Sequence, residues 1–421
     1  MLMHLGSIPV VVVSNADVAR LVLKTHELTF LNRRVVGVLN KLTYNGKDNH
    51  GEYWKQIKGF LVHHLLSKER VGSFHEVRKE ELDLMIHKIG ETCGSVVNFS
   101  ELISSLSINV ICRLVLGRKY NGKKFENMVE QPKKLVFMVT IGQYIPWLSW
   151  LDDLIGINGK IQKVVKEYDE FIEEQLRPKF DQENCLSDIL LRKLLEAEHG
   201  FEYSRETIKA MILDIFTGAT DTAFTALEWA FSELVRNPRV MKTLQKQVDS
   251  ITRGKLNINE DDLEKLNYLN AVVKETLRLH PPAPIIPRAS TQDVRLMGYN
   301  IESGTRVFIN VWAIGRDPSV WEEPEEFKPE RFLNPNYDFK GSHFEFIPFG
   351  AGRRGCPGVH FATIFMKLVI ANTVYKFDLS VSPGDKGENL DMSESTAFTV
   401  HRKNPLLLVA TRRYEFSGKN M

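Results

Sequence analysis

The run Arg205–Arg236 constrains the fold more than any other part of the sequence. Ser204 is a typical helix-capping residue and Asn237-Pro238 ends the pattern, so the run predicts one uninterrupted helix. Its apolar side chains, Ile212 and Trp229 among them, surround the helix axis, and a helix that is apolar all round is buried. At 1.5 Å per residue the helix would be about 48 Å long. The rest of the chain must therefore enclose it in a large, helix-rich interior.

The remaining pattern supplies the enclosing elements. Helical periodicity is clear over residues 53–66, 68–90, 99–116, 160–175 and 359–377, and an amphipathic helix is expected to begin at Asn15. Strand patterns cover residues 5–13, 307–311, 397–400 and 406–410, and residues 317–348 predict an irregular but packed segment. The predicted fold class is mainly α with a smaller β part, and we expect residues 1–421 to form a single domain.

Composition excludes several classes of protein. With 421 residues, 43% of them hydrophobic and 26% charged, the chain is an ordinary globular protein. Its 55 basic and 53 acidic side chains are too balanced for a dedicated nucleic-acid binder. The four cysteines lie far apart without a CxxC pair, which argues against a disulfide scaffold and favours a reducing compartment. No apolar run approaches the roughly 18 residues that a membrane span needs.

The strongest chemical signal is the segment 349–358, which reads FGAGRRGCPG and immediately precedes a predicted helix. A cysteine at a helix N-terminus gains backbone N–H donors and the positive end of the helix dipole, and both stabilise a thiolate. The glycines let the backbone approach a flat cofactor closely. An isolated cysteine in a glycine-rich loop is more often an incidental buried residue, whereas the whole ten-residue pattern favours Cys356 as a thiolate, with Phe349 and Gly358 at the two ends of its loop.

Two further patterns flank this segment. Glu275 and Arg278 lie one helical turn apart, so their side chains share a helix face, and 329–332 reads PERF. An isolated pair of this kind is usually a solvated surface salt bridge. In the long helix, residues 218–222 read GATDT, a polar interruption that needs hydrogen-bond partners in a buried helix. We expect its threonine hydroxyls to bond back to carbonyls four residues earlier.

Taken together in this order, these motifs resemble the cytochrome P450 family along nearly the whole chain. The resemblance implies the cytochrome P450 fold, haem b as the cofactor and Cys356 as the axial ligand of its iron. It implies that Glu275, Arg278 and Arg331 form a buried structural network, and that Asp221 and Thr222 deliver protons to dioxygen. It also assigns cofactor-binding positions: Trp54, Lys58, Arg288, Phe349, Arg354 and Gly358.

Three positions depart from the family pattern. Ala219 stands where the family usually has a glycine, and Ala223 stands where plant members usually have a second hydroxyl residue. Lys58 replaces the arginine of the family's Trp-x-x-x-Arg element, so the positive charge is kept and the planar guanidinium is lost. The catalytic acid and alcohol positions are both retained.

The resemblance is greatest to plant microsomal members that oxidise specialised metabolites. It implies a haem-thiolate monooxygenase that uses dioxygen and electrons from NADPH, delivered by NADPH–cytochrome P450 reductase, to oxidise a lipophilic small molecule. The expected pocket lining is Ile215, Phe216, Ala219, residues 283–286 and Phe398. The implied location is the cytosolic face of the endoplasmic reticulum membrane. The membrane anchor, proline-rich hinge and first helix of such proteins are not found in this sequence, and the loop at Asn49 looks shortened.

Two alternatives remain at this point. One is a member that rearranges peroxides without dioxygen, but such members often lack the acid and threonine found here as Asp221 and Thr222. The other is a truncated, non-catalytic haem-binding remnant, which the N-terminal differences and Lys58 would favour.

Overall fold

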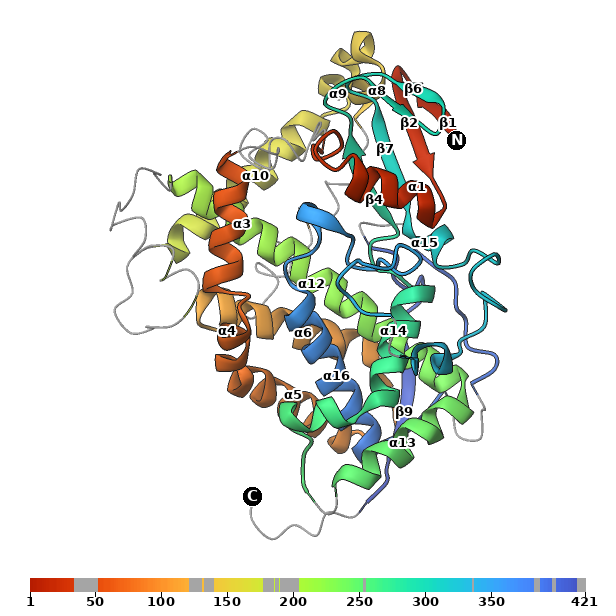
Figure 1. The fold of residues 1–421 in the computed structure, drawn as a ribbon. Helices are drawn as coiled ribbons and strands as arrows, with labels where there is room; N and C mark the ends of the chain where they lie inside the picture. The colour runs from red at the N-terminus through yellow and green to blue at the C-terminus, as the bar shows by residue number, and fades with distance from the viewer. Residues whose placement is uncertain are drawn as a thin grey trace.

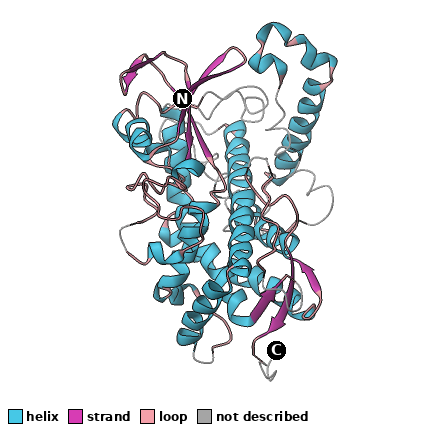
Figure 2. Ribbon diagram, turned by 90° about the vertical axis from the view of Figure 1, so that its right-hand side faces the viewer, coloured by secondary structure: helices cyan, strands magenta, loops and turns pink. Residues whose placement is uncertain are grey.

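The computed structural model describes residues 1–33, 52–120, 131, 140–176, 185, 189, 204–252, 255–334, 337–381, 387–395 and 399–414. Within these ranges the chain is mainly helical with a smaller strand part, as predicted (Figures 1 and 2). The expected loop at Asn49 and the expected pocket residue Phe398 lie outside the described residues.

The helices follow one another through the body of the molecule. They are α1 (Ala16–Arg20), α3 (Glu52–His64), α4 (Lys68–Ser73), α5 (His75–Glu91), α6 (Phe99–Leu116), α8 (Ile141–Tyr144), α9 (Trp150–Leu154), α10 (Ile157–Gln175), α12 (Arg205–Arg236), α13 (Pro238–Thr252), α14 (Asn267–Leu279), α15 (Val311–Ile314) and α16 (Val359–Lys376). A π-helical turn, Leu21–Thr25, continues α1, and 3₁₀ turns include η4 (Pro329–Phe332) and η5 (Gly352–Arg354).

Helix α12 has the bounds that the sequence predicts and lies among the other helices at the centre of the molecule (Figure 2). The Ser204 hydroxyl caps it by accepting the N–H of Thr207 at 3.2 Å. Side chains are buried along its whole length, including Trp229 and Phe231 at 0% exposure. The prediction of a buried, fold-spanning helix is therefore confirmed.

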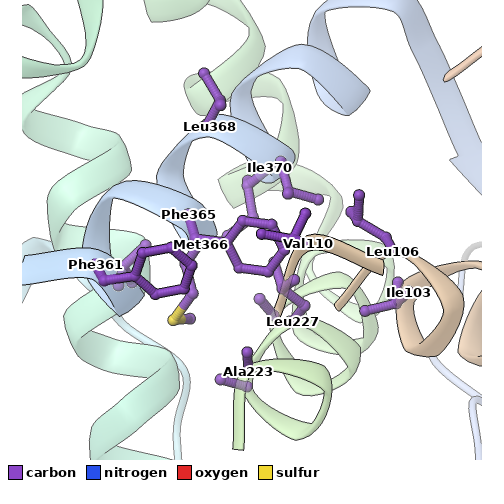
Figure 3. Close-up of a cluster of buried hydrophobic side chains, with 14 of the residues drawn as sticks. Ile103, Leu106, Val110, Ala223, Leu227, Phe361, Phe365, Met366, Leu368 and Ile370 are labelled. Carbon is purple, nitrogen blue, oxygen red and sulfur yellow. The ribbon is translucent and has the colours of Figure 1, made fainter. Parts of the chain in front are cut away.

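The main core lies where α12 crosses α6 and α16. Figure 3 shows Val110 of α6, Leu227 of α12 and Phe365 of α16 pointing toward one another across this crossing. All three are almost completely buried. Burying side chains of this size contributes about 1.5–3 kcal/mol each, so this crossing is a principal source of stability.

Strands form two separate sheets and a hairpin. A four-stranded sheet has the order β1 (Leu2–Leu5), β2 (Ile8–Val13), β7 (Arg306–Asn310) and β4 (Ile285–Ala289), with β2 and β7 parallel. A three-stranded sheet of β3 (Val96–Asn98), β9 (Leu407–Arg412) and β8 (Phe377–Ser380) lies at the opposite end of the molecule (Figures 1 and 2). Strands β5 (Val294–Leu296) and β6 (Tyr299–Ile301) pair as a hairpin.

Several predicted boundaries need correction. The expected helix over residues 68–90 is two helices, because the chain leaves helical geometry at Phe74, whose ring is buried and lies beside Arg70 at 5.0 Å. The strand pattern over residues 5–13 is two strands, separated by a turn in which Gly6 has φ +62°. Of the expected strand over residues 397–400, residues 396–398 are outside the described part, and Thr399 and Val400 are not in a strand.

The fold sets the cysteine segment at the boundary between two hydrophobic cores. Phe349 packs against the main helical core, whereas Ala351 belongs to a second core beneath the four-stranded sheet, with Leu23 and Val307. Residues 344–347, just before the segment, divide between the same two cores. The loop that follows is therefore anchored on both sides before it reaches Cys356.

Candidate haem-thiolate site

The cysteine loop is held by its own backbone. The Cys356 N–H donates to the Phe349 carbonyl at 2.9 Å, which closes the loop, and the Gly355 N–H donates to Gly352 at 2.9 Å. Gly352 has φ +70°, and a Cβ at this position would meet the Leu23 carbonyl oxygen at 2.6 Å. The glycine is therefore required both by the backbone conformation and by the close approach of the neighbouring helical turn.

Cys356 has an accessible side chain within dense protein surroundings. Its side chain is exposed, so an incoming cofactor can reach it, but desolvation by the nearby chain raises the pKa of the thiol. A hydrogen bond from the Gly358 backbone and the positive charge of Lys58 act in the opposite direction and lower that pKa. The start of α16 thus stabilises the thiolate as predicted, but desolvation has the larger effect on the pKa of the thiol.

Beside the loop, Trp54 and Lys58 of α3 lie close to Arg354 and form a second cluster. Trp54 and Lys58 are four residues apart and share one face of α3, as the sequence predicts. The guanidinium of Arg354 lies 4.1 Å from the centre of the Trp54 ring, and the Lys58 amine lies 5.3 Å from it. The Lys58 amine also donates to the carbonyls of Arg353 and Gly355. These residues, distant in sequence, are brought together.

Arg288 joins the site from strand β4. It is 3% exposed, and its guanidinium donates to the Pro287 carbonyl at 2.9 Å. Arg288 and Arg354 line one recess, together with apolar residues and Glu27. Two buried guanidinium groups in one recess are an arrangement that suits anionic carboxylates.

Helix α12 opens on one side at its middle. Gly218 is exposed and Ile215, Ala219 and Thr222 are partly exposed, although most residues of the helix are buried. A Cβ added at Gly218 would have nothing within 4 Å. We call Ile215, Gly218, Ala219 and Thr222 the open stripe. Phe216, which the sequence placed in the pocket lining, is instead 4% exposed and belongs to the main core.

The threonines of α12 bond back along the helix as expected. The hydroxyls of Thr220 and Thr222 donate to the carbonyls of Phe216 and Gly218, each at 2.6 Å, and Thr217 donates to Leu213. The Thr222 hydroxyl thus lies on the open stripe and donates to the Gly218 carbonyl, which is part of the helix backbone. This sharing satisfies the polar group and loosens the backbone locally.

Asp221 lies away from the open stripe. Its carboxylate is 9% exposed and accepts a hydrogen bond from the hydroxyl of Thr399, in the C-terminal segment. Thr399 in turn accepts from the Thr225 hydroxyl at 3.0 Å. The acid and the alcohol predicted as catalytic are adjacent in the chain, but they face different surroundings.

The Glu275–Arg278 pair is a buried structural network, as the motif predicts. Both side chains are fully buried, and Arg278 makes two bonds of 2.8 Å to the Glu275 carboxylate. Arg278 also donates to the carbonyls of Gly315, Pro324 and Glu326. Arg331 and the Lys328 N–H reach the same Glu275 oxygen at 3.3 and 2.8 Å. The alternative of a solvated surface pair is therefore wrong.

The described residues fit a haem. Cys356 offers an accessible thiol at the end of a glycine-rich loop, and the soft sulfur is a suitable iron ligand. Gly218 provides a place on α12 where a flat group meets no side chain, and Arg288 and Arg354 supply the cations that haem propionates need. A soft sulfur ligand, a helix surface without a side chain, and two cations for the propionates are the features that a haem-thiolate pocket requires.

Comparison with known proteins agrees with this geometry. The family model described as Cytochrome P450 matches residues 1–409. This chain belongs to the cytochrome P450 family. Among plant relatives, Cytochrome P450 Tp4149 of Tanacetum parthenium is 49% identical over 98% of this chain and 86% of its own length. Psoralen synthase of Ammi majus is 44% identical over 97% and 85%.

A solved structure shows the same cytochrome P450 fold. The zebra fish cytochrome P450 with abiraterone is 25% identical and matches with a TM-score of 0.81 over 98% of this chain and 96% of that one. With the plant relatives, this match confirms the predicted family, the predicted fold and an oxygen-incorporating oxidoreductase that carries haem.

Sequence reasoning missed three residues of this P450 site. Glu27 accepts the Arg353 N–H and pairs with its guanidinium at 3.4 Å, while Thr225 and Thr399 form the hydroxyl chain to Asp221. Glu27 and Arg353 are 326 residues apart and Asp221 and Thr399 are 178 apart, so no local pattern signals either contact.

Among the helices of the described ranges, α6 alone combines the length and apolar composition that a membrane crossing requires. More than half of that helix is buried in the fold, where it packs along α12.

Proposed function

We propose that this cytochrome P450 monooxygenase oxidises a lipophilic specialised metabolite, with residues 1–421 acting as one domain and electrons coming from NADPH through NADPH–cytochrome P450 reductase. The observation that carries the proposal is that this chain has both an accessible cysteine at the end of a glycine-rich loop and an open stripe on the otherwise largely buried α12. The haem would activate dioxygen, with one oxygen atom entering the substrate and the other leaving as water.

The substrate class follows from the chemistry of the exposed side chains. Ile215 and Ala219 on the open stripe and Ile285 on β4, at 47% exposure, are apolar surfaces. An accessible aliphatic lining favours a lipophilic small molecule over a charged one. The name of the Ammi majus relative, psoralen synthase, supports a plant specialised metabolite of this kind.

Each remaining site residue has a role in holding the cofactor. Cys356 would bind the iron, and Arg288, Arg354 and Lys58 would supply the positive charge near the propionates, with Trp54 stacked beneath the Arg354 guanidinium. Phe349 and Gly358 bracket the cysteine, through the carbonyl that closes the loop and the N–H that favours a thiolate.

Asp221 and Thr222 would manage protons. Thr222 places its hydroxyl on the open stripe, where it can exchange a hydrogen bond with dioxygen or water. Asp221, the preceding residue, holds a buried carboxylate that faces Thr399, and it would have to turn toward the open stripe to pass a proton to that hydroxyl. Their presence also distinguishes the proposed reaction from the peroxide-rearranging alternative.

Partners and location rest on surface chemistry. Lys55 and Arg353 are exposed on the cysteine side, where cations would attract an acidic reductase, whereas Lys367 is only partly exposed. Trp147, Trp150, Leu154 and Ile155 around α9 are 56–76% exposed, and the adjoining α8 contacts the turn between β1 and β2. This apolar surface suits the interface of a membrane, and we propose the cytosolic face of the endoplasmic reticulum.

Isotope labelling tests the proposed reaction. The haem-loaded chain, reconstituted with the reductase, would be supplied with lipophilic plant metabolites under ¹⁸O₂ and analysed by mass spectrometry. We expect one labelled oxygen atom per oxidised product, dependent on NADPH. Product that carries oxygen only from a supplied peroxide would instead establish the rearranging reaction, and a folded, haem-loaded chain without turnover on any metabolite would favour the haem-binding remnant.

A further inference from the structure

Lys58 contacts the cysteine loop itself. Its amine, half-buried beneath the loop, donates to the carbonyl of Arg353 and, at 3.3 Å, to the carbonyl of Gly355, the residue before Cys356. We propose that Lys58 is a positioning residue for the thiolate: it fixes the loop from α3 so that the Cys356 sulfur keeps its place as an iron ligand. This inference rests on the proposed ligand role of Cys356.

The loop is held on two sides by charged side chains, and each charge matches the backbone group that it contacts. On one side the Glu27 carboxylate accepts the N–H of Arg353, and a Cβ at Gly352 would collide with the turn that carries Glu27. On the other side, the Lys58 ammonium donates hydrogen bonds to the carbonyls of Arg353 and Gly355, the residues that flank Arg354. The Glu27 carboxylate accepts from an N–H of the turn, and the Lys58 ammonium donates to its C=O groups. Rotation of the 3₁₀ turn η5 would therefore break these charge-assisted hydrogen bonds.

A lysine suits this task better than the arginine that the family usually has there. The ammonium is compact and offers three donors, so it can serve two carbonyls that lie on the same short turn. A guanidinium is planar and rigid and fits the two oxygens of one carboxylate. In this chain Arg354 and Arg288, which line the recess together, already provide such groups. The cations therefore differ in their contacts: Arg288 and Arg354 line the recess, and Lys58 adds positive charge beside it while its ammonium bonds to the loop.

The contacts of Lys58 compensate its half-buried ammonium for lost water. The ammonium donates to the loop carbonyls of Arg353 and Gly355 and lies 5.3 Å from the centre of the Trp54 ring. Direct contacts therefore hold this cation against the cysteine loop.

The test compares the haem-loaded wild type with Lys58→Gln, Lys58→Arg and, as a matched control, Lys55→Gln, which removes an exposed charge one turn earlier on α3. Each protein is reduced under carbon monoxide, and the conversion of the thiolate-type absorption band into the thiol-type band is followed in mild denaturant. We expect Lys58→Gln to convert about tenfold faster, because it loses about two charge-assisted hydrogen bonds. Lys58→Arg keeps the charge but fits the two carbonyls less well, so its rate should fall between those of the wild type and Lys58→Gln, and Lys55→Gln should stay within about twofold of the wild type.

A second measurement, the rate of haem loss, distinguishes positioning of the cysteine loop by Lys58 from simple binding of a propionate. If Lys58 only held a propionate, Lys58→Gln would lose haem faster to an acceptor protein, while the haem still bound kept the wild-type proportion of the thiolate band. That result, or a Lys58→Arg variant as labile as Lys58→Gln, would overturn the proposal. If the wild type itself lacks the thiolate band, the ligand role of Cys356 fails instead.

Hydrogen exchange keeps the proposal testable should Lys58→Gln not load haem. The amides of Gly355 and Cys356 donate within the loop, so their exchange reports its opening. In the wild type and Lys58→Gln compared without haem, we expect about tenfold faster exchange at these amides in the variant. Equal exchange rates would overturn the proposal.

Discussion

The cysteine side and the α12 side of the proposed haem site are built in opposite ways. On the cysteine side, Glu275 and Arg278 are fully buried and bonded to several partners, and the loop is held by its own backbone as well as by Glu27 and Lys58. On the α12 side, the open stripe is apolar except for one hydroxyl, and that hydroxyl donates to a carbonyl of its own helix. In the proposed function, the cysteine side would hold the iron ligand, and the open stripe would leave room for a substrate and for proton transfer.

The comparison teaches which changes each face tolerates. A fully satisfied buried polar network is expensive to break, because every lost partner leaves a desolvated charge. A hydroxyl on an accessible surface can be removed with little effect on folding, because water replaces its hydrogen bonds. Substitutions on the cysteine side should therefore act on stability and haem loading, and substitutions on the open stripe should act on the reaction.

The largest effect is expected from Glu275→Gln. It removes the charge that faces Arg278 and Arg331 in a buried setting, so we expect a loss of about 3–5 kcal/mol in the free energy of unfolding and little haem incorporation. Denaturant titration and haem content measure both. Glu330→Gln is the control, because the pair of Glu330 with Arg239 is largely exposed and should contribute about 1 kcal/mol or less. Equal losses in the two variants would contradict the structural role of the network.

Removing the hydroxyl of the open stripe should separate reaction from stability. Thr222→Ala is expected to fold and load haem normally, yet to lower product formed per NADPH about tenfold or more, because proton delivery is impaired. Thr222→Ser keeps the hydroxyl and should recover most of the yield. An unchanged ratio of product to NADPH in Thr222→Ala would show that Thr222 does not relay protons.

A smaller effect should follow from Thr399→Val, which lies behind the stripe. This change takes away the hydroxyl between Asp221 and Thr225, and we expect about 1–3 kcal/mol less stability in thermal or denaturant unfolding. Thr399→Ser should restore that stability. If Thr399→Val is as stable as the wild type, the hydroxyl chain does not hold the buried carboxylate.

Prediction from sequence was most accurate where the signal is local. Helices α6 and α12 have the predicted bounds, because their apolar periodicity ends at capping or breaking residues such as Gly117, Ser204 and Pro238. Strand β4 went unpredicted because Pro287 lies within it; the strand is at the edge of its sheet, where a proline is tolerated. The hairpin of β5 and β6 was also missed, although its Met297-Gly298 turn has positive φ at both residues.

The candidate site divides in the same way. Cys356, Glu275 and Arg278 lie in compact motifs whose residue spacing alone indicates their chemistry. Contacts such as Lys58 with Gly355 or Asp221 with Thr399 join segments far apart in the chain, and only the fold brings them together. Which face of α12 is open also depends on the elements packed around it, so the burial of Phe216 could not be inferred from the helix itself.

The carbon-monoxide difference spectrum of the reduced, haem-loaded chain tests the central claim most directly. If Cys356 is the iron ligand, the wild type shows the thiolate-type band, Cys356→Ser lacks it, and Cys93→Ser, which changes a partly buried cysteine outside the loop, keeps it. A folded, haem-loaded wild type without this band, or a Cys356→Ser variant that retains it, would contradict the account.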